Sequence, residues 1–247
     1  MWQGRVHIGD GWAAYNGLAS DQASHAHAAI QVILAGNGEA SVEVAGGARV
    51  KGGDLVIPPM LKHRLFPSKH PMTLLYLDAR LSMARSIIKH IPQDVVAALP
   101  DHWKLRFGTT FETAIAAMRA QTEVECLGVH RLDHRLEAAL ECISRDPRPG
   151  AIERAALVVG LSSPRLRTLA RMQLRLPLSK WLLWRKLERA GRAIMLGESL
   201  AQAALAGGFA DQAHMARTMR RMFGVRPSEA ALPLRNRSVQ EAEASAP

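Results

Sequence analysis

Two histidines near the N-terminus, His25 and His27, are separated by a single residue. On a β-strand, side chains two positions apart point to the same face, so both imidazoles can reach one ligand. Imidazole nitrogen is a common ligand of divalent transition metals, and neutral histidines also occur in ordinary small-molecule pockets. Further histidines show no spacing that indicates a shared site: His7, His70, His90, His102, His130 and His134.

Arginine is the second chemically suggestive group, and it is concentrated in the C-terminal part of the chain. The formal net charge is +10, from 32 Lys and Arg against 22 Asp and Glu. Between Arg148 and Arg237 arginine is frequent and acidic residues are few. Such a surface attracts polyanions, either nucleic acid or an anionic bilayer. No stretch approaches the roughly 18 apolar residues of a membrane span, and the opening MWQGRVHIGD lacks a signal-peptide core, so we predict a cytoplasmic protein without membrane contact.

Catalytic motifs are not evident. The sequence has no nucleophile elbow, phosphate-binding glycine loop or paired-cysteine motif, so we predict that the protein is not an enzyme. The two cysteines, Cys126 and Cys142, are too few for a disulfide framework. They suit a reducing compartment as small buried apolar residues.

The elements that position these residues change type along the chain. Residues 1–80 contain short β-type runs separated by glycine turns, at 31–34, 41–44, 54–57 and 74–77. Close strand spacing with frequent turns predicts a small antiparallel sandwich or barrel. From residue 81 the pattern becomes helical, with apolar residues on one helix face at Leu132, Leu136, Ala139, Leu140 and Ile143.

Two prolines in residues 146–150 (DPRPG) then break any helix, and we place the main domain boundary there. The predicted organisation is an α+β multidomain protein: a β-domain at 1–80, a helical linker or dimerisation segment at 81–146, an all-α domain at 147–234 and a disordered tail at 235–247.

An internal repeat lies in the basic part. Residues 152–163 (IERAALVVGLSS) match residues 200–211 (LAQAALAGGFAD), with Gly160 and Gly208 at the same position. Each copy predicts a short helix, a glycine that tolerates a left-handed backbone and a polar residue that caps the next helix, which is typical of a helix-turn-helix unit. The second helices should bury one apolar face and expose arginines on the other. One such face alone would be an ordinary solvated surface, but the repetition favours DNA binding through the major groove.

The segment 199–228, SLAQAALAGGFADQAHMARTMRRMFGVRPS, strongly resembles the signature of AraC/XylS-type transcription regulators. The resemblance extends back through a connecting helix at 181–194 to the first unit at 160–179, about the last third of the chain. It implies base contacts by Pro164, Arg167, Thr168, Gln212, Ala213, His214 and Arg217. It implies phosphate contacts by Arg171, Arg220 and Arg221. Pairing of Arg217 with Asp211 is the alternative to base reading. Two positions depart from the family: Ala170 replaces a large aromatic residue and Arg175 replaces glycine.

The N-terminal part is similar to the cupin-like effector domain common in the same family. The resemblance rests on the order and spacing of His25, His27, Gln31, Gly38, Gly52, Pro58 and His63. It implies a β-barrel in which His25, His27 and His63 face the lumen and could hold a divalent transition metal. Gln31 stands where metal-binding cupins usually have glutamate, and Met60 where they have glycine. Ordinary pocket or structural histidines are therefore the alternative to a metal site.

Together these features predict a sequence-specific DNA-binding transcription regulator, controlled by a small ligand or metal in the N-terminal barrel. Its expected partners are double-stranded DNA, a second copy of the chain through residues 132–143, and RNA polymerase if it is an activator. The alternative function is a cupin metalloenzyme with a basic helical appendage, which gives the repeat no role.

Overall fold

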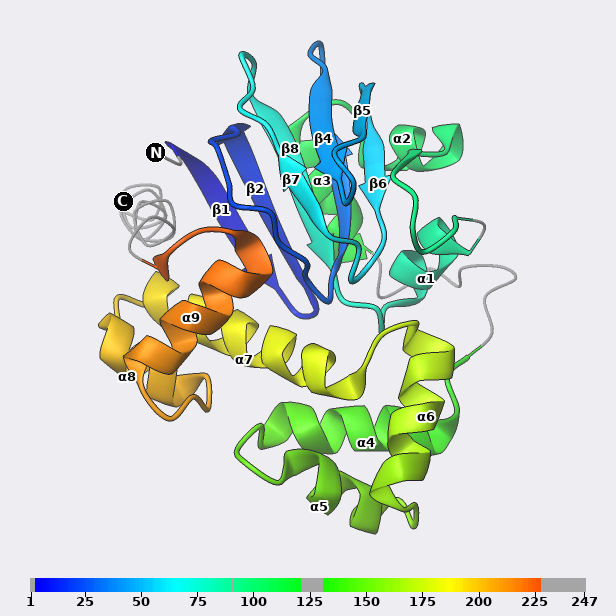
Figure 1. The fold of residues 1–247 in the computed structure, drawn as a ribbon, viewed down its shortest axis with the longest axis vertical. Coiled ribbons are helices and arrows are strands. Elements are labelled where there is room, and N and C mark those ends of the chain that lie inside the picture. The colour runs from blue at the N-terminus through cyan, green and yellow to red at the C-terminus, as the bar shows by residue number, and fades with distance from the viewer. Residues whose placement is uncertain (1–2, 90, 121–130, 228–247) are drawn as a thin grey trace, which may run out of the picture.

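The computed structural model describes residues 3–89, 91–120 and 131–227 (Figure 1). The N-terminal part contains two antiparallel sheets, a six-stranded sheet in the order β1-β2-β8-β3-β6-β9 and a three-stranded sheet in the order β5-β4-β7. The strands are β1 (Gln3–Gly9), β2 (Trp12–Leu18), β3 (Ile30–Leu34), β4 (Ala40–Val44), β5 (Arg49–Gly52), β6 (Leu55–Ile57), β7 (His63–Leu65), β8 (Met72–Leu77) and β9 (Ala97–Ala98). The predicted tail at 235–247 lies outside the described residues, as does Cys126.

Strand pairing does not close the two sheets into a barrel within the described ranges. Of the two predicted forms, sandwich or barrel, the strands form a sandwich, and the barrel that the cupin resemblance implied is corrected. An isolated bridge pairs His63 of β7 with His25, which lies in the segment between β2 and β3. The facing side chains of the two sheets fill the space between them, among them Ile33, Leu65 and Leu74, each fully buried. The four predicted strands are present as β3, β4, β6 and β8, whereas β1, β2, β5, β7 and β9 were not foreseen, and β9 lies in the segment predicted to be helical.

Three short helices cover the other face of the larger sheet: α1 (Ser82–Ile88), α2 (Asp101–Phe107) and α3 (Phe111–Arg119). Met83, Phe107 and Met118 pack there with sheet residues such as Val32 and Leu75 in one apolar core. The helices α1, α2 and α3 therefore belong to the N-terminal core and do not form a free linker, because their apolar side chains pack against the sheet.

The remaining helices form the C-terminal part: α4 (His134–Arg145), α5 (Ala151–Val158), α6 (Ser163–Leu174), α7 (Leu178–Met195), α8 (Leu200–Ala206) and α9 (Gln212–Phe223). In Figure 1, α7 runs between the sheets and α4 and connects the α5–α6 pair with the α8–α9 pair. The apolar face of α4, predicted to dimerise, packs into the same core as Trp181 of α7 and Leu166 of α6. It is buried inside this chain and offers no surface to a second copy.

Both helix pairs turn as the sequence predicted. Gly160 and Gly208 have left-handed backbones, with φ of 65° and 78°. Ser162 caps α6 by accepting a hydrogen bond from the Arg165 amide, and Asp211 caps α9 by accepting one from the His214 amide at 2.6 Å. In the described part of the chain, no helix is long and apolar enough to cross a bilayer.

Candidate nucleic-acid interface and ligand pocket

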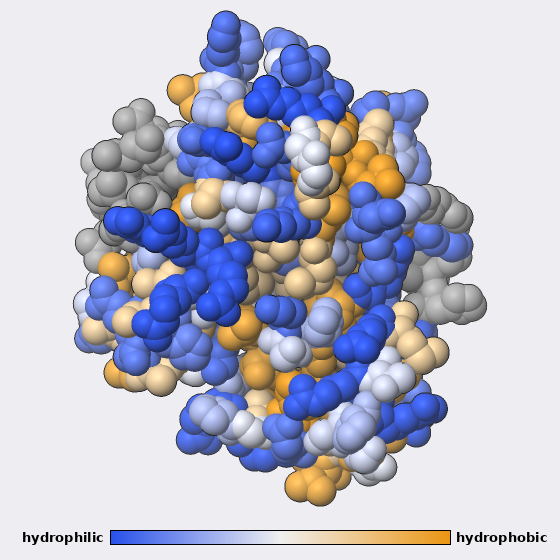
Figure 2. Space-filling view, viewed as in Figure 1, coloured by the Kyte–Doolittle hydropathy of each residue, from blue (hydrophilic) through white to orange (hydrophobic). Residues whose placement is uncertain are grey.

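The second helix of each pair exposes one polar face. On α6, Leu166, Ala170 and Leu174 are buried. On α9, Met215, Thr218 and Met222 are buried. The predicted DNA-contacting residues lie on the opposite faces and are exposed, except that His214 is half-buried: Pro164, Arg167, Thr168 and Arg171 on α6, and Gln212, Ala213, His214, Arg217, Arg220 and Arg221 on α9. Hydrophilic side chains cover α9 in Figure 2.

The exposed faces of α6 and α9 differ in whether their arginines form ion pairs within the chain. Arg167 forms an ion pair with Glu153 of α5 at 2.7 Å. On α9, by contrast, Arg217, Arg220 and Arg221 form no ion pair with any residue that the structure describes. The Asp211 carboxylate is used as the helix cap, so the alternative pairing with Arg217 is not seen. The α9 arginines are therefore available to an external anion.

The three predicted histidines come together in the N-terminal part. His25, His27 and His63 are buried, and their ring nitrogens lie within 4.8 Å of one another. Each Nδ1 contacts a backbone carbonyl two residues away, at 2.9 Å, 2.8 Å and 2.9 Å respectively. A carbonyl only accepts, so Nδ1 carries the proton and Nε2 keeps a lone pair. The Gln31 side-chain amide lies 3.0 Å from Nε2 of His27 and 3.1 Å from Nε2 of His63. Because these two Nε2 atoms accept, the amide presents its N–H group to them, with its oxygen and nitrogen positions exchanged.

Burial keeps these imidazoles neutral. It lowers the pKa of His25 to about 4, with a further contribution from His27. Burial also lowers the pKa of His27, and lowers that of His63 well below its usual value. Neutral imidazoles with oriented Nε2 lone pairs are what a transition metal requires, so the donor set fits such an ion. The same arrangement also suits a packed polar cluster.

A cavity of about 160 Å³ lies between the larger sheet and the C-terminal helices. Its walls come from β1, β2 and β8 on one side and from α7 and α9 on the other, and they are mainly apolar: Val6, Ile8, Ala13, Ala14, Tyr15, Gln22, Tyr76, Trp184, Leu187, Glu188, Ala190, Gly191, Ile194, Met215, Met219, Phe223 and Val225.

An aromatic cluster joins this cavity to the histidines. The ring of Phe223, the last residue of α9, lies 5.6 Å from that of Tyr76 and 5.9 Å from that of Trp184. The His27 ring lies 5.3 Å from the Tyr76 ring and 6.2 Å from the Phe223 ring. One side of α9 therefore lines the cavity while its other side carries the exposed arginines.

Comparison with known families decides the nature of the C-terminal part. Residues 155–231 match the model of a helix-turn-helix domain family. This region is an AraC-type helix-turn-helix domain. The predicted resemblance is thereby confirmed, and the chain is a DNA-binding transcription regulator. Among curated proteins no relative matches the chain.

Solved structures of ToxT from Vibrio cholerae share the fold over nearly the whole length. ToxT from strain O395 is 10% identical with a TM-score of 0.58, covering 92% of this chain and 99% of its own. A structure of ToxT bound to (E)-4-(8-methylnaphthalen-1-yl)but-3-enoic acid has 10% identity, a TM-score of 0.57 and coverage of 91% and 99%. Unsaturated fatty acid-bound ToxT from strain SCE256 has 10% identity, a TM-score of 0.55 and coverage of 96% and 99%. At this identity the likeness concerns the fold alone.

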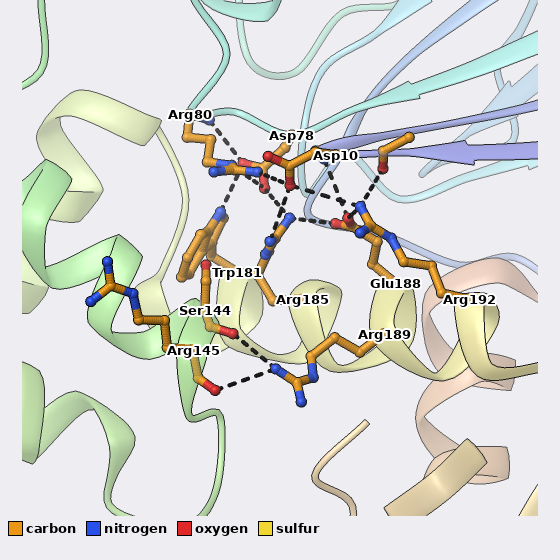
Figure 3. A network of polar contacts seen from close by, with 12 residues as sticks. Asp10, Asp78, Arg80, Ser144, Arg145, Trp181, Arg185, Glu188, Arg189 and Arg192 are labelled. Carbon is orange, nitrogen blue, oxygen red and sulfur yellow. Dashed lines mark hydrogen bonds and ion pairs between the residues drawn. The ribbon is translucent and has the colours of Figure 1, made fainter. Parts of the chain in front are cut away.

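The AraC-type domain is tied to the sheets by an ionic network on α7, the clasp, made of Asp10, Asp78, Arg80, Arg185, Glu188 and Arg192 (Figure 3). Glu188 accepts from Arg185 at 2.5 Å and from Arg192 at 2.6 Å. Arg185 also lies 3.4 Å from Asp10 in the β1–β2 turn. Burial raises the pKa of Glu188, although the two arginines oppose the shift.

A second contact between the AraC-type domain and the N-terminal part involves Arg175, one of the two positions that differ from the family. Arg175, where the family has glycine, ends α6 with a left-handed φ of 59°. Its Nη1 donates to the carbonyl of Ile88 at 2.9 Å and to that of Ile91 at 3.2 Å, at the end of α1. Met60, the other glycine replacement, is also left-handed, with φ of 67°. In both cases the backbone keeps the shape that glycine favours.

The clasp and the cavity were missed at the sequence level. The acidic residue Glu188 stands out in a basic region, three residues after Arg185 and four before Arg192, which is ion-pair spacing on a helix. That spacing could have indicated the clasp. Tyr76, Trp184 and Phe223 carried no comparable signal.

Proposed function

We propose that both helix pairs of the AraC-type domain read duplex DNA and that a small ligand in the cavity between the sheets and α7 and α9 controls this reading. The observation that carries the proposal is the double role of α9. Met215, Met219 and Phe223 line the cavity, while Arg217 and its exposed neighbours face away from it. A ligand that repacks the cavity side would move the DNA side with it.

The proposed DNA contacts follow the exposed faces. Gln212, Ala213, His214 and Arg217 would meet base edges from α9, and Pro164, Arg167 and Thr168 from α6. Arg171, Arg220 and Arg221 would contact phosphates.

The position of the effector differs from the barrel lumen expected from the sequence. The space between the two sheets is filled by buried side chains, whereas the cavity beside α9 has room for a small ligand. The ToxT structures with a bound fatty acid or naphthalene acid support small-molecule control within this fold.

A metal at His25, His27 and His63 is a second proposed effector. It is favoured by the convergence of three Nε2 lone pairs, each oriented by a carbonyl on Nδ1. The contact between the His27 and Phe223 rings would carry its effect to α9. A cupin metalloenzyme remains the weaker alternative because it assigns no role to the exposed faces of α6 and α9.

The test is selection of binding sites from a random duplex pool by the full chain at fixed salt. Arginine forms two parallel hydrogen bonds to guanine, worth about 1–3 kcal/mol of discrimination, whereas a phosphate contact is shared by all sequences. Arg217→Ala should lose base preference at one position of the site, and Arg221→Ala should weaken binding to all sequences.

Salt dependence is a second readout. With about six phosphate contacts, a plot of the logarithm of the binding constant against the logarithm of the salt concentration should have a slope near −5. Unchanged preference in Arg217→Ala would refute base reading by that residue.

A further inference from the structure

The cavity beside α9 combines apolar walls with polar groups that have no protein partner. The Tyr76 hydroxyl and the Gln22 amide, both in the lining, form no hydrogen bond with any described residue. Gln22 is only 5% exposed, and Trp184 is a third lining residue whose Nε1 is buried without a partner. A buried polar group without a hydrogen bond is costly, so a bound ligand would satisfy the Trp184 N–H, and the Tyr76 and Gln22 groups, which are not fully shielded, can add to its binding.

All three groups are neutral, and donation is the one capacity that they share, because the Tyr76 hydroxyl and the Gln22 amide can also accept a hydrogen bond whereas the Trp184 indole cannot. Burial raises the pKa of Tyr76, so its hydroxyl keeps the proton that it can donate. The Gln22 amide and the Trp184 indole each carry N–H groups. The complementary ligand group is therefore an oxygen that accepts hydrogen bonds.

The charges around the cavity disfavour an anion. Glu188 is the charged residue in the lining, and no lysine or arginine joins it among the described lining residues. The nearby guanidiniums use their Nη atoms in the clasp, Arg185 with Glu188 and Asp10, and Arg192 with Glu188 and with the Gly9 carbonyl at 2.7 Å, while their buried Nε atoms have no partner. A carboxylate would enter without a free cation and beside another carboxylate, which is strongly unfavourable at a buried site.

The size of the cavity limits the ligand further. An apolar protein cavity of about 150 Å³ accommodates benzene. The cavity of about 160 Å³ therefore suits one aromatic ring or an aliphatic group of similar volume.

From these observations we infer that the effector is a neutral molecule about the size of a single aromatic ring, carrying one oxygen that accepts a hydrogen bond from Tyr76, Gln22 or Trp184. This rests on the proposed function of the cavity. The proposed ligand of this chain is neutral and so differs from the carboxylic acids bound in the ToxT structures.

The experiment compares four probes of similar shape on the full-length chain by isothermal titration calorimetry: toluene, acetophenone, p-cresol and benzoate. Acetophenone and p-cresol should bind about fivefold or more tightly than toluene, the effect of one buried hydrogen bond. Benzoate should bind more weakly than toluene. Equal binding of toluene and acetophenone, tighter binding of benzoate, or no binding of any probe at millimolar concentration would each overturn the inference.

Variants locate the hydrogen bond. Tyr76→Phe keeps the ring and should reduce the advantage of acetophenone over toluene, as should Gln22→Met if the amide shares the contact. Leu187→Met changes the same wall without a hydrogen-bonding group and should leave that advantage unchanged. If neither Tyr76→Phe, Gln22→Met nor Trp184→Phe changes the advantage, the three donors do not recognise the ligand and the inference is wrong.

A DNA-binding assay with and without saturating acetophenone separates this inference from the proposed function. Ligand binding in the predicted order with unchanged DNA affinity would refute control by the cavity while leaving its ligand chemistry intact. A change in DNA affinity caused by benzoate, and not by acetophenone, would refute the chemistry while supporting control.

Discussion

The indole N–H of Trp181 donates a hydrogen bond to Oδ1 of Asp78 across 2.8 Å, and both side chains are fully buried. This contact fastens the long helix of the AraC-type domain to the end of β8. Asp78 also lies 3.4 Å from Arg80 and 3.8 Å from Arg185. A buried carboxylate therefore contacts both the DNA-binding part and the end of the larger sheet.

Neutralising Asp78 should strongly destabilise the full chain. Asp78→Asn leaves buried guanidinium charge uncompensated, and we expect the free energy of unfolding to fall by about 3 kcal/mol. Asp10→Asn removes a carboxylate of the same clasp that is 70% exposed, and should cost about 0–1 kcal/mol. Urea denaturation followed by circular dichroism measures both variants. Equal losses would show that burial of Asp78 does not matter.

The left-handed end of α6 gives a prediction about backbone shape. Arg175→Ala and Arg175→Gly lose the same contacts with the α1 carbonyls, but only glycine tolerates φ of 59° without strain. The glycine variant should be more stable by about 1 kcal/mol. Arg171 is an exposed residue in the middle of α6. There the alanine variant should be more stable than the glycine variant by about 1 kcal/mol, because glycine weakens a helix interior. The same order at both sites in thermal unfolding would contradict the assignment.

The ion pair between Arg167 and Glu153 should limit DNA binding by the first helix pair. Glu153→Gln frees the guanidinium, and we expect DNA affinity to rise about two- to fivefold. Glu137→Gln on α4 removes the same charge without freeing an arginine, since Glu137 is exposed and has no ion pair with a described residue. Fluorescence anisotropy at fixed salt compares the variants. An equal rise in both would reflect net charge alone.

Local signals predicted the C-terminal fold, and long-range contacts explain what was missed. Gly160, Gly208 and the capping residues Ser162 and Asp211 each act within a few residues of chain. The Trp181 hydrogen bond instead joins positions 103 residues apart. No periodicity or motif specifies such a pairing. The three histidines were foreseen only because a family resemblance supplied the long-range relation of His63 to His25 and His27.

The end of α9 packs against the segment that contains Ala23 and His25, and the absence of a side chain at Gly224 allows this close contact. A Cβ at Gly224 would lie 2.5 Å from the Ala23 carbonyl oxygen and 3.1 Å from Nδ1 of His25. Gly160 has a similar left-handed φ, 65° against 71°, but open space around it. Gly160→Ala should cost about 1 kcal/mol, and Gly224→Ala about 2–4 kcal/mol because crowding adds to the strain. Chemical denaturation giving equal costs would show that α9 does not depend on close contact with this segment.

The histidine cluster should bind a divalent transition metal more tightly when Gln31 becomes a carboxylate. Gln31→Glu places a negative charge beside Nε2 of His27 and His63, where the side-chain amide now lies, and Zn²⁺ affinity should rise at least about tenfold. His63→Ala should abolish binding, whereas His70→Ala changes an exposed histidine outside the cluster and should leave it intact. Elemental analysis and titration calorimetry on untagged protein measure stoichiometry and affinity. Metal binding should also raise the unfolding temperature, because the unfolded chain does not hold the three imidazoles together. If neither wild type nor Gln31→Glu takes up Zn²⁺, Ni²⁺ or Mn²⁺, the cluster is a packed polar core and α9 responds to the cavity alone.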